Sequence, residues 1–420
     1  MNGYSATLEY LYGLEKFGIV FGLDTINWIL SLIEDPQHSL KTIHVGGTNG
    51  KGSVTRMISG VLQEAGYRVG RYTSPHLISF TERIAINETE ITQEEIVHLT
   101  QFVKGRTDAS DPSRTFTFFD FTTALAFEYF RREQVDVAVI EVGLGGRLDS
   151  TNVIRPLVSV ITNVERDHVD YLGESIVDIA REKAGILKHG IPAVTGADGI
   201  ALEIIRTTAG EQTPLFVLNR DFFFNRTGDQ TLSYQGLTHV LSDVKVGLAG
   251  AHQLSNCALA LCALEVSADY GFPVAEEAIR AALSKISWPG RLEVLRHKPT
   301  ILLDAAHNPH GAKALAAHLT AHYPGRKKIL VFGVMKDKDF ASMLGELAPL
   351  ANELVLTRPH IDRSAAPQDL LPVAGRGHVA EHVSDALLKA REMARDDDVI
   401  VVTGSFYTVG EARSIIEQLF

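Results

Sequence analysis

The chain has 420 residues, more than a single hydrophobic core usually supports, so we expect two domains. Its 45% apolar and 22% charged residues are ordinary for a soluble globular protein, and no run approaches the roughly 18 apolar residues of a membrane-spanning helix. The net charge of −11 leaves no basic excess to neutralise phosphate chains, which argues against nucleic-acid and membrane-surface binding.

The N-terminal residues are of mixed polarity and contain no signal-type apolar segment. Two cysteines, Cys257 and Cys262, lie in one helical pattern at an offset that is awkward for a disulfide. We therefore expect both thiols to be reduced core residues in a reducing compartment. These features predict a cytoplasmic protein, and we expect it to be a monomer.

Short β-branched runs alternate with helical patterns along the first part of the chain, which predicts an α/β domain with a mainly parallel sheet. Strands are expected at 42–45, 68–73, 135–142, 157–162 and 191–195, and helices at 54–65, 94–103, 122–131 and 176–187. Between 215 and 247 the pattern changes to short alternating pieces, which predict a small antiparallel sheet with strands at 222–224, 231–234 and 239–241. Two further helices are expected at 253–270 and 274–286.

A Trp-Pro-Gly-Arg segment at 288–291 interrupts the helical pattern and is the best candidate for an interdomain joint. Beyond it the alternation begins again, with strands expected at 300–303, 328–332, 353–357 and 399–403 and helices at 312–322, 340–347, 383–394 and 409–419. This pattern predicts a smaller, doubly wound, Rossmann-like domain. We therefore predict a P-loop-type domain over 1–287, a joint at 288–293 and a second domain over 294–420.

The most informative segment is a glycine-rich turn between the first expected strand and its helix. A strand, such a turn and a helix form a phosphate cradle, because glycines let backbone N–H groups converge on an anion and the helix N-terminus adds its dipole. Lys51 adds a positive charge, and Ser53 offers a hydroxyl to a magnesium ion bound to the phosphates. The cradle consists of Gly47, Thr48, Asn49, Gly50, Lys51, Gly52 and Ser53.

The spacing of this turn departs from the common P-loop pattern, because Gly47 lies only three positions before Gly50 and Gly52 separates Lys51 from Ser53. A glycine-rich turn without a ligand is the alternative. One turn rarely needs several glycines together with a lysine and a serine, so the segment predicts binding of a nucleoside triphosphate.

Polar side chains follow three expected strands of the first domain, with Ser74, Glu141 and His168 among them. In an open α/β sheet ligands collect at the carboxyl ends of the strands, so these side chains should converge on the triphosphate. A hydroxyl, a carboxylate and an imidazole suit a magnesium site that keeps several waters, although histidine is an unusual magnesium ligand. Each residue alone also fits a capping or structural role, and their repetition beside the cradle favours a metal site.

Other candidates have alternatives that the residues leave open. Lys183 lies in a Glu/Lys-rich helical pattern, which favours a surface lysine. Asp304 ends an expected strand and could cap the next helix, but together with His307 it better suits contacts to a nucleotide. Arg291, in the joint, reaches the phosphates on closure or forms an interdomain ion pair.

The segment 47–53 resembles the ATP loop of the Mur-type amide ligases, which accounts for its unusual spacing. Further motifs resemble folylpolyglutamate synthase and its bifunctional bacterial form, which is also a dihydrofolate synthase. They are FGLD at 21–24, TSPHL at 73–77, ERI at 82–84, EVGLGGRLD at 141–149, DH at 167–168, REKAGI at 181–186, PGRLE at 289–293, DAAHNP at 304–309 and TGSFY at 403–407. Their order holds from about residue 20 to the C-terminus, so chance similarity is very improbable.

The resemblance implies ATP and two magnesium ions as cofactors, and it implies roles for individual residues. The positions that match the metal ligands are Ser53, Ser74, Glu141, His168 and Lys183. Lys183 matches a lysine that is carbamylated in the family, which reverses its interpretation as a surface residue. The positions that match nucleotide contacts outside the cradle are Asn256 for the adenine, and Arg291, Asp304 and His307 for the nucleotide and the transferring phosphate.

The resemblance also implies residues that contact the substrates. Phe119 matches an aromatic residue that stacks on the pterin in bifunctional members, with core packing at a helix start as its alternative. Ser405 matches the position expected to bind the incoming glutamate, and we assign Asp149, at the end of the 141–149 motif, to the substrate as well.

The activity that the resemblance implies is an ATP-dependent ligase that adds L-glutamate to dihydropteroate and extends folate polyglutamates through an acyl phosphate. A monofunctional folylpolyglutamate synthase is the alternative. The expected catalytic residues are Lys51, His168, Lys183, Arg291 and His307. A peptidoglycan-precursor ligase is disfavoured because only about 45 residues precede the ATP loop, and a nucleotide-dependent switch is disfavoured by the metal-competent residues. The expected partners are ATP, L-glutamate and dihydropteroate or a reduced folate.

Overall fold

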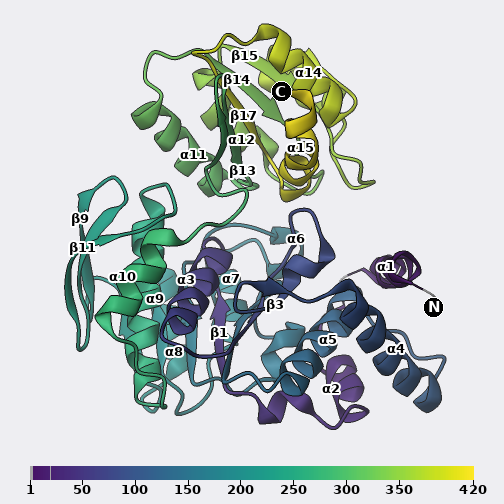
Figure 1. Ribbon diagram of the computed structural model, residues 1–420, viewed down its shortest axis with the longest axis vertical. Coiled ribbons are helices and arrows are strands. Elements are labelled where there is room, and N and C mark those ends of the chain that lie inside the picture. Colours follow the sequence, from purple (N-terminus) through teal and green to yellow (C-terminus); the bar gives the residue numbers. More distant parts are fainter. Residues whose placement is uncertain (1–2, 19) are drawn as a thin grey trace.

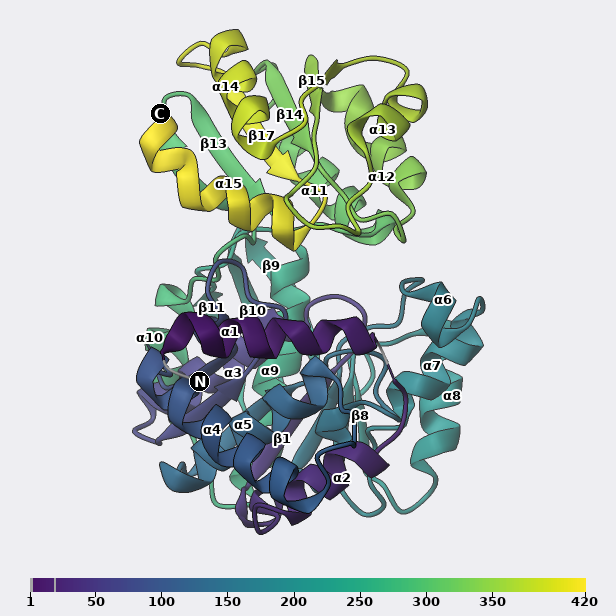
Figure 2. The same cartoon turned by 90° about the vertical axis from the view of Figure 1, so that its right-hand side faces the viewer.

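The computed structural model describes residues 3–18 and 20–420 and forms two lobes, each built around a sheet of its own. Figures 1 and 2 show the lobe that carries the N-terminus below the lobe that carries the C-terminus, with the chain passing between them after α10 (Glu276–Lys285). None of the helices in these ranges is long and apolar enough to cross a membrane.

The first lobe is centred on an eight-stranded sheet in the order β4-β3-β2-β5-β1-β6-β7-β8. The six strands from β2 to β8 are parallel, and β3 and β4 add an antiparallel edge. The central strands are fully buried, as expected for β-branched runs covered on both faces. The bounds are β1 Thr42–Gly46, β2 Val69–Tyr72, β3 Ile84–Ile86, β4 Thr89–Glu90, β5 Val137–Glu141, β6 Val158–Ile161, β7 Ala193–Thr195 and β8 Leu215–Val217.

Helices cover both faces of this sheet. One core lies between the sheet and α3, α9 and α10, and another lies on the opposite face beneath α1, α2, α4 and α5. The remaining helix bounds of this lobe are α1 Tyr4–Gly13, α2 Asp24–Ser31, α3 Lys51–Glu64, α4 Gln93–Ser110, α5 Phe118–Arg132, α6 Val169–Leu172, α7 Ile176–Ala184, α8 Gly199–Ala209 and α9 His252–Ala268. Short 3-10 turns are η1 Leu14–Phe17, η2 Pro36–Ser39, η3 Phe80–Arg83 and η4 Ser150–Val153. The two cysteines are free and buried in α9, as predicted.

The predicted small antiparallel sheet is confirmed. It consists of β9 (Phe223–Gly228), β10 (Thr231–Gln235) and β11 (Val240–Lys245) in the order β11-β10-β9. It packs against α9 and α10 at the edge of the first lobe (Figure 1).

The second lobe has a six-stranded sheet in the order β12-β13-β17-β14-β15-β16, parallel except for the β12–β13 pair. Helices α11, α12 and α13 cover one face, and α14 and α15 cover the other, which confirms the predicted doubly wound arrangement. The strands are β12 Glu293–His297, β13 Thr300–Asp304, β14 Lys328–Phe332, β15 Glu353–Leu356, β16 His378–Val379 and β17 Val399–Thr403. The helices are α11 Pro309–His322, α12 Phe340–Leu347, η5 Ala348–Leu350, α13 Pro367–Ala374, α14 Val383–Met393 and α15 Phe406–Leu419.

Several helix starts differ from the prediction, and at α3 and α5 a specific feature of the backbone or cap explains the difference. Helix α3 begins at Lys51 rather than at 54, because Gly50 adopts a left-handed conformation (φ 85°) that turns the loop directly into the helix. Helix α5 begins at Phe118 rather than at 122, because Thr117 and Asp120 form a capping box. The prediction also missed the helices α1, α2, α6, α8 and α13 and the strands β3, β4, β8, β12 and β16. Pro372 inside α13 disguises the helical pattern of that helix.

Candidate active site

A cavity of about 380 Å³ lies between the two lobes, at the carboxyl ends of the strands of the first sheet. Residues from the first lobe form its floor, and residues from the second lobe form its roof. The predicted residues that line it are Thr48, Asn49, Gly50, Lys51, Gly52, Ser53, Ser74, Glu141, His168, Asn256, Arg291, Asp304 and His307.

The glycine-rich loop needs glycine at two positions for both conformation and space. Gly47 has φ 134° and Gly50 has φ 85°, values that other residues rarely adopt. A Cβ atom on Gly47 would overlap the Thr162 hydroxyl, and one on Gly50 would lie 2.5 Å from the Asn256 side-chain oxygen. The loop is therefore held tightly between β6 and α9, and the N–H groups of Thr48 and Asn49 donate to the backbone and side-chain oxygens of Asn163 at 3.0 and 2.9 Å.

Two lysine ammonium groups converge on one carbonyl oxygen of this loop. Lys51 Nζ donates to Gly47 O at 3.2 Å and to Thr48 O at 3.1 Å, and Lys183 Nζ donates to Gly47 O at 3.0 Å. Lys183 is only 4% exposed, which excludes the surface lysine that its local pattern favoured and agrees with the reversal implied by the family resemblance. Burial, together with the Lys51 charge, lowers the pKa of Lys183 to about 7. This arrangement favours an anion beside the two lysines.

Glu141, at the end of β5, is the buried carboxylate that the first lobe contributes to the cavity. Its Oε2 accepts the N–H of Ser74 at 3.1 Å. Burial raises the pKa of Glu141 to about 7, although the Lys51 charge opposes this change. A divalent cation would offset the cost of burying the ionised carboxylate. No group of three or more His, Cys, Asp or Glu side chains among the described residues forms a metal cage, so a cation here fits hydroxyl, phosphate and water ligands best.

His168 follows β6 and has the left-handed backbone conformation, with φ 51°. Burial lowers the pKa of its imidazole to about 3, although the neighbouring Asp167 charge opposes this change. The neutral ring accepts a hydrogen bond from Lys338 Nζ, which lies 3.2 Å from Nε2. The Lys338 ammonium shows that a cation fits beside His168, which is what a metal-ligating histidine requires.

The second lobe contributes Arg291 and Asp304. The Arg291 guanidinium lies over the Phe406 ring, 4.6 Å from its centre. Asp304 accepts the N–H groups of Leu292 at 3.0 Å and Ala306 at 3.1 Å. Asp304 therefore anchors the chain at the joint, and the alternative that it caps the following helix is wrong.

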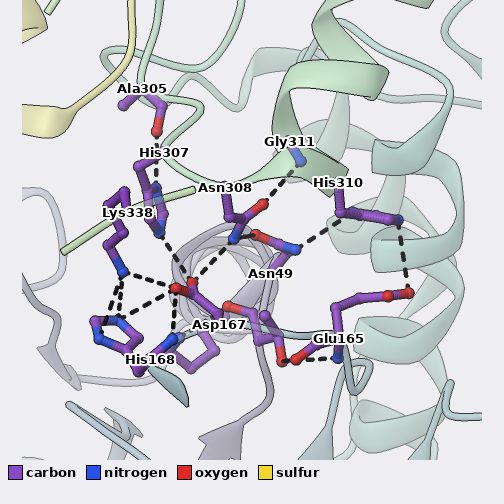
Figure 3. A network of polar contacts seen from close by, with 12 residues as sticks. Asn49, Glu165, Asp167, His168, Ala305, His307, Asn308, His310, Gly311 and Lys338 are labelled. Atoms are coloured by element: carbon purple, nitrogen blue, oxygen red, sulfur yellow. Dashed lines mark hydrogen bonds and ion pairs between the residues drawn. The ribbon is translucent and has the colours of Figure 1, made fainter. Parts of the chain in front are cut away.

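The cap of α11 is Asn308, whose side-chain oxygen accepts the N–H of Gly311 at 2.8 Å. Its amide nitrogen donates to Asn49 Oδ1 at 2.9 Å and to Asp167 Oδ2 at 3.0 Å, and so joins the second lobe to two loops of the first lobe (Figure 3). His307 Nδ1 donates to Ala305 O at 3.0 Å, and its Nε2 faces Asp167 Oδ2 at 3.6 Å.

Asp167 and Lys338 complete this network and were missed as site residues by sequence reasoning. Lys338 Nζ donates to Asp167 Oδ1 at 2.7 Å, and both side chains are buried. Burial raises the pKa of Asp167, but His307, His168 and Lys338 outweigh this and hold it well below its usual range. Lys338 lies shortly after the carboxyl end of β14, so the strand-end argument applied to the second lobe would have found it.

Three predicted substrate residues do not line the cavity. The Phe119 ring lies against Gly143, which does line it, and is stacked 6.0 Å from the Tyr72 ring. Asp149 is buried and accepts the N–H of Leu144 at 2.8 Å. Ser405 is the N-cap of α15 and accepts the N–H of Thr408 at 3.0 Å. Their roles in substrate binding stay predictions.

Two protein families match this chain. The Mur ligase middle domain matches residues 45–264, and the Mur ligase, glutamate ligase domain matches residues 290–406. The chain belongs to the Mur ligase family. The motifs that predicted this family therefore gave the correct assignment, and the two matched segments correspond to the two lobes.

Relatives place the chain in one branch of the Mur ligases. The Bacillus subtilis dihydrofolate synthase/folylpolyglutamate synthase is 34% identical, with 98% of this chain and 99% of the relative covered. The Lacticaseibacillus casei folylpolyglutamate synthase is 35% identical, with 98% of each chain covered. The chain is thus a member of the dihydrofolate synthase/folylpolyglutamate synthase branch.

Solved structures share the whole fold. The E. coli FolC structure in complex with DHPP and ADP superimposes with a TM-score of 0.92 at 31% identity, covering 99% of this chain and 98% of that one. The bifunctional folylpolyglutamate synthase/dihydrofolate synthase from Yersinia pestis, complexed with AMPPNP and Mn ion, has a TM-score of 0.89 at 33% identity. The match covers 99% of this chain and 98% of that one.

Proposed function

We propose that this Mur ligase adds L-glutamate to dihydropteroate and extends folate polyglutamates, with ATP converted to ADP and phosphate. The observation that carries this proposal is the cavity between the lobes. There a phosphate loop with Lys51 and the buried Glu141 lie opposite Arg291 and His307 of the second lobe, and the buried Lys183 contacts the same loop through the Gly47 carbonyl oxygen. The names of the full-length relatives give the acceptor class.

The nucleotide and metal assignments follow from this proposal. Residues 47–53 would cradle the phosphates, Asn256 would contact the adenine, and Asp304 would contact the nucleotide. Two magnesium ions would be held by Ser53, Ser74, Glu141, His168 and Lys183, and would neutralise charge on the phosphates. The nucleotides and the Mn ion bound by the structural relatives support this assignment.

The chemistry begins with a carboxylate, which is a poor electrophile. Its oxygen attacks the γ-phosphate of ATP, the bond to the bridging oxygen breaks and ADP leaves, giving an acyl phosphate. The amine of glutamate then attacks the acyl carbon, phosphate leaves and an amide forms. Because two anions approach each other in the first step, the Lys51 ammonium lowers their repulsion and Arg291 stabilises the transferring phosphate.

We also propose that Lys183 is carbamylated. The neutral amine adds to carbon dioxide, a nitrogen–carbon bond forms and the displaced proton goes to solvent. The two lysines on the Gly47 carbonyl support this, because a carbamate turns their repulsion into attraction. Protein equilibrated with ¹³C-bicarbonate should give a carbamate signal in ¹³C spectra that Lys183→Arg lacks; a signal retained in the variant would contradict the assignment.

The division into domains at 1–287, 288–293 and 294–420 is part of the same proposal, with closure protecting the acyl phosphate from water. Full activity in an isolated 1–287 segment would contradict it.

We propose a cytoplasmic monomer, supported by a cavity that a single chain completes and by two free cysteines. Light scattering of the purified chain tests the oligomeric state.

The deciding experiment measures phosphate release from ATP and glutamate with either dihydropteroate or tetrahydrofolate as the acceptor. Turnover with both establishes the bifunctional ligase and supports Phe119 as a pterin contact. Turnover with tetrahydrofolate alone establishes the monofunctional alternative. Hydrolysis that needs neither an acceptor nor glutamate would instead support a nucleotide-dependent switch.

A further inference from the structure

Asp167 is the point at which the second lobe meets the metal-competent loop of the first. Its Oδ1 accepts Lys338 Nζ at 2.7 Å, and its Oδ2 accepts Asn308 Nδ2 at 3.0 Å. Both donors belong to the second lobe, one from the loop after β14 and the other from the start of α11 (Figure 3). We call Asp167, Lys338, Asn308 and Asn49 the interlobe cluster.

The same carboxylate also fixes its own loop. Asp167 Oδ1 accepts the backbone N–H of His168 at 2.8 Å, and Lys338 Nζ lies 3.2 Å from the His168 ring. The second donor, Asn308, reaches Asn49 of the phosphate loop at 2.9 Å with the nitrogen that contacts Asp167. A movement of the second lobe therefore displaces two loops of the site at once.

We propose that Asp167 is a positioning residue that makes the geometry of His168 and of the phosphate loop depend on closure of the second lobe. This inference rests on the proposed ligase function and extends it. The carboxylate acts through Lys338 and Asn308, and it need not touch a substrate.

A merely structural ion pair explains these contacts less well. The Lys338 and Asp167 side chains are 8% and 7% exposed, and burying two charges costs free energy that good geometry only offsets. When the lobes separate, both charges return to water, so the pair adds little to the stability of either lobe alone. The ion pair between Asp167 and Lys338 forms only when the lobes are closed, so it stabilises the closed arrangement over the open one.

The first test is a double-mutant cycle of Asp167→Asn and Lys338→Met. Each single change leaves a buried charge without its partner, so we expect kcat to fall about 100-fold in each. The double variant should fall no further than the worse single variant, because both changes remove one contact. Independent, multiplying losses would overturn the proposal.

The matched control is Lys336→Met, on the same loop as Lys338. Lys336 is exposed and donates only to the Asp362 carbonyl oxygen at 3.1 Å among the contacts described for its side chain. We expect its kcat to match the wild type. Thermal unfolding of every variant distinguishes loss of folding from loss of closure. If Asp167→Asn does not fold, Lys338→Met tests the same contact from the second lobe.

The second test does not depend on turnover. Small-angle scattering with AMPPNP and Mg²⁺ should give a larger radius of gyration for Asp167→Asn and Lys338→Met than for the wild type and Lys336→Met. The dissociation constant for AMPPNP should rise in Asp167→Asn and Lys338→Met but not in Lys336→Met, because the contacts proposed for Arg291 and Asp304 of the second lobe form only in the closed arrangement. Equal radii would overturn the proposal whether or not kcat falls. A wild type without folate-dependent turnover would instead contradict the proposed function, while the radii would still test closure.

Discussion

Lys51 and Lys183 present two positive charges to one carbonyl oxygen inside the protein. Burial lowers the pKa of both ammonium groups, and the Lys51 charge lowers the pKa of Lys183 further, because like charges at short range disfavour the protonated form. Two ammonium groups on one carbonyl oxygen indicate a site built to receive negative charge. The same physical argument underlies the proposed carbamate and the proposed triphosphate.

We expect Lys183→Ala to lower the rate of phosphate release at least about 1,000-fold, because it removes a buried charged group next to the transferring phosphate. The fold should persist, as judged by circular dichroism and thermal unfolding. Lys188→Ala is the control, since Lys188 contacts only Asn152 outside the cavity among its described contacts. Turnover like that of the wild type in Lys183→Ala would remove this residue from the mechanism.

Glu141→Gln should separate stability from activity. The folded pKa of Glu141 is about 7 against an ordinary 4.5, so the native state holds a proton that the unfolded chain releases. Stability therefore falls as the pH rises from about 4.5 to 7, and the cost remains above 7. With EDTA present, urea unfolding should show the variant more stable by about 3 kcal/mol at pH 8, with no difference near pH 4.

Magnesium should reduce or reverse the stability difference between Glu141→Gln and the wild type at pH 8. The ion should stabilise the wild type at pH 8 but not Glu141→Gln, because the amide carries no charge for the cation to offset. Equal stabilisation of both proteins by magnesium would show that Glu141 does not hold the metal. Phosphate release should be lost in the variant at every pH.

At the scale of secondary structure, one carboxylate of α9 organises the turn between β10 and β11. Glu265 accepts the Tyr234 hydroxyl at 2.7 Å and the N–H groups of Leu237 and Thr238, each at 2.9 Å, and of His239 at 2.6 Å. Burial raises the pKa of Glu265, but these hydrogen bonds outweigh it and the net change is downward. Glu265 thus adds a set of polar contacts to the apolar packing of the small sheet against the main core.

Glu265→Gln should destabilise the first lobe by about 2 kcal/mol at pH 7, because the amide nitrogen would face N–H donors. Since the folded pKa is lowered, the contribution of Glu265 is present above the ordinary value of 4.5 and is lost as the pH falls through the lowered pKa. Urea unfolding at pH 7 and pH 4 measures the difference. Glu277→Gln, on the exposed face of α10, is the control; an equal effect there would contradict the assignment.

At the scale of the molecule, the lobes also meet through backbone contact away from the cavity. Leu77 of the first lobe packs against the core beneath α14 and α15. A Cβ atom on Gly410 of α15 would overlap the Leu77 carbonyl oxygen, so glycine is required there by close approach. The joint lies next to the same contact, because Gly290 also faces the Leu77 side chain.

Gly410→Ala should push the Leu77 segment away and impair closure, which lowers kcat about 10- to 100-fold. Gly345→Ala is the control, because a Cβ atom there meets nothing within 4 Å and alanine favours a helix. We expect Gly345→Ala to keep its activity and to gain about 0.5–1 kcal/mol of stability. Steady-state kinetics and thermal unfolding of both variants test this prediction. If Gly410→Ala had the same kcat as Gly345→Ala, the contact between Gly410 and Leu77 would not limit closure.

Much of the fold is readable from the chain. The strands at 42–45, 135–142, 157–162 and 399–403 are continuous apolar runs that only a sheet covered on both faces can bury, and all are confirmed. The N-terminal boundaries of α3 and α5 could not be read from the sequence. They depend on the left-handed backbone of Gly50 and on the reciprocal hydrogen bonds between Thr117 and Asp120. Local patterns give the existence of an element more readily than its end.

The sequence by itself determined the phosphate loop, the family and the residues of the first lobe that meet at the strand ends. These features are local, since spacing and residue type carry them along a few positions of the chain. The tertiary structure alone decided that Lys183 is buried, that Asp304 anchors the joint and that Asp167 and Lys338 are partners. The last two lie 171 positions apart, and only the packing of one lobe on the other brings their charges within 2.7 Å.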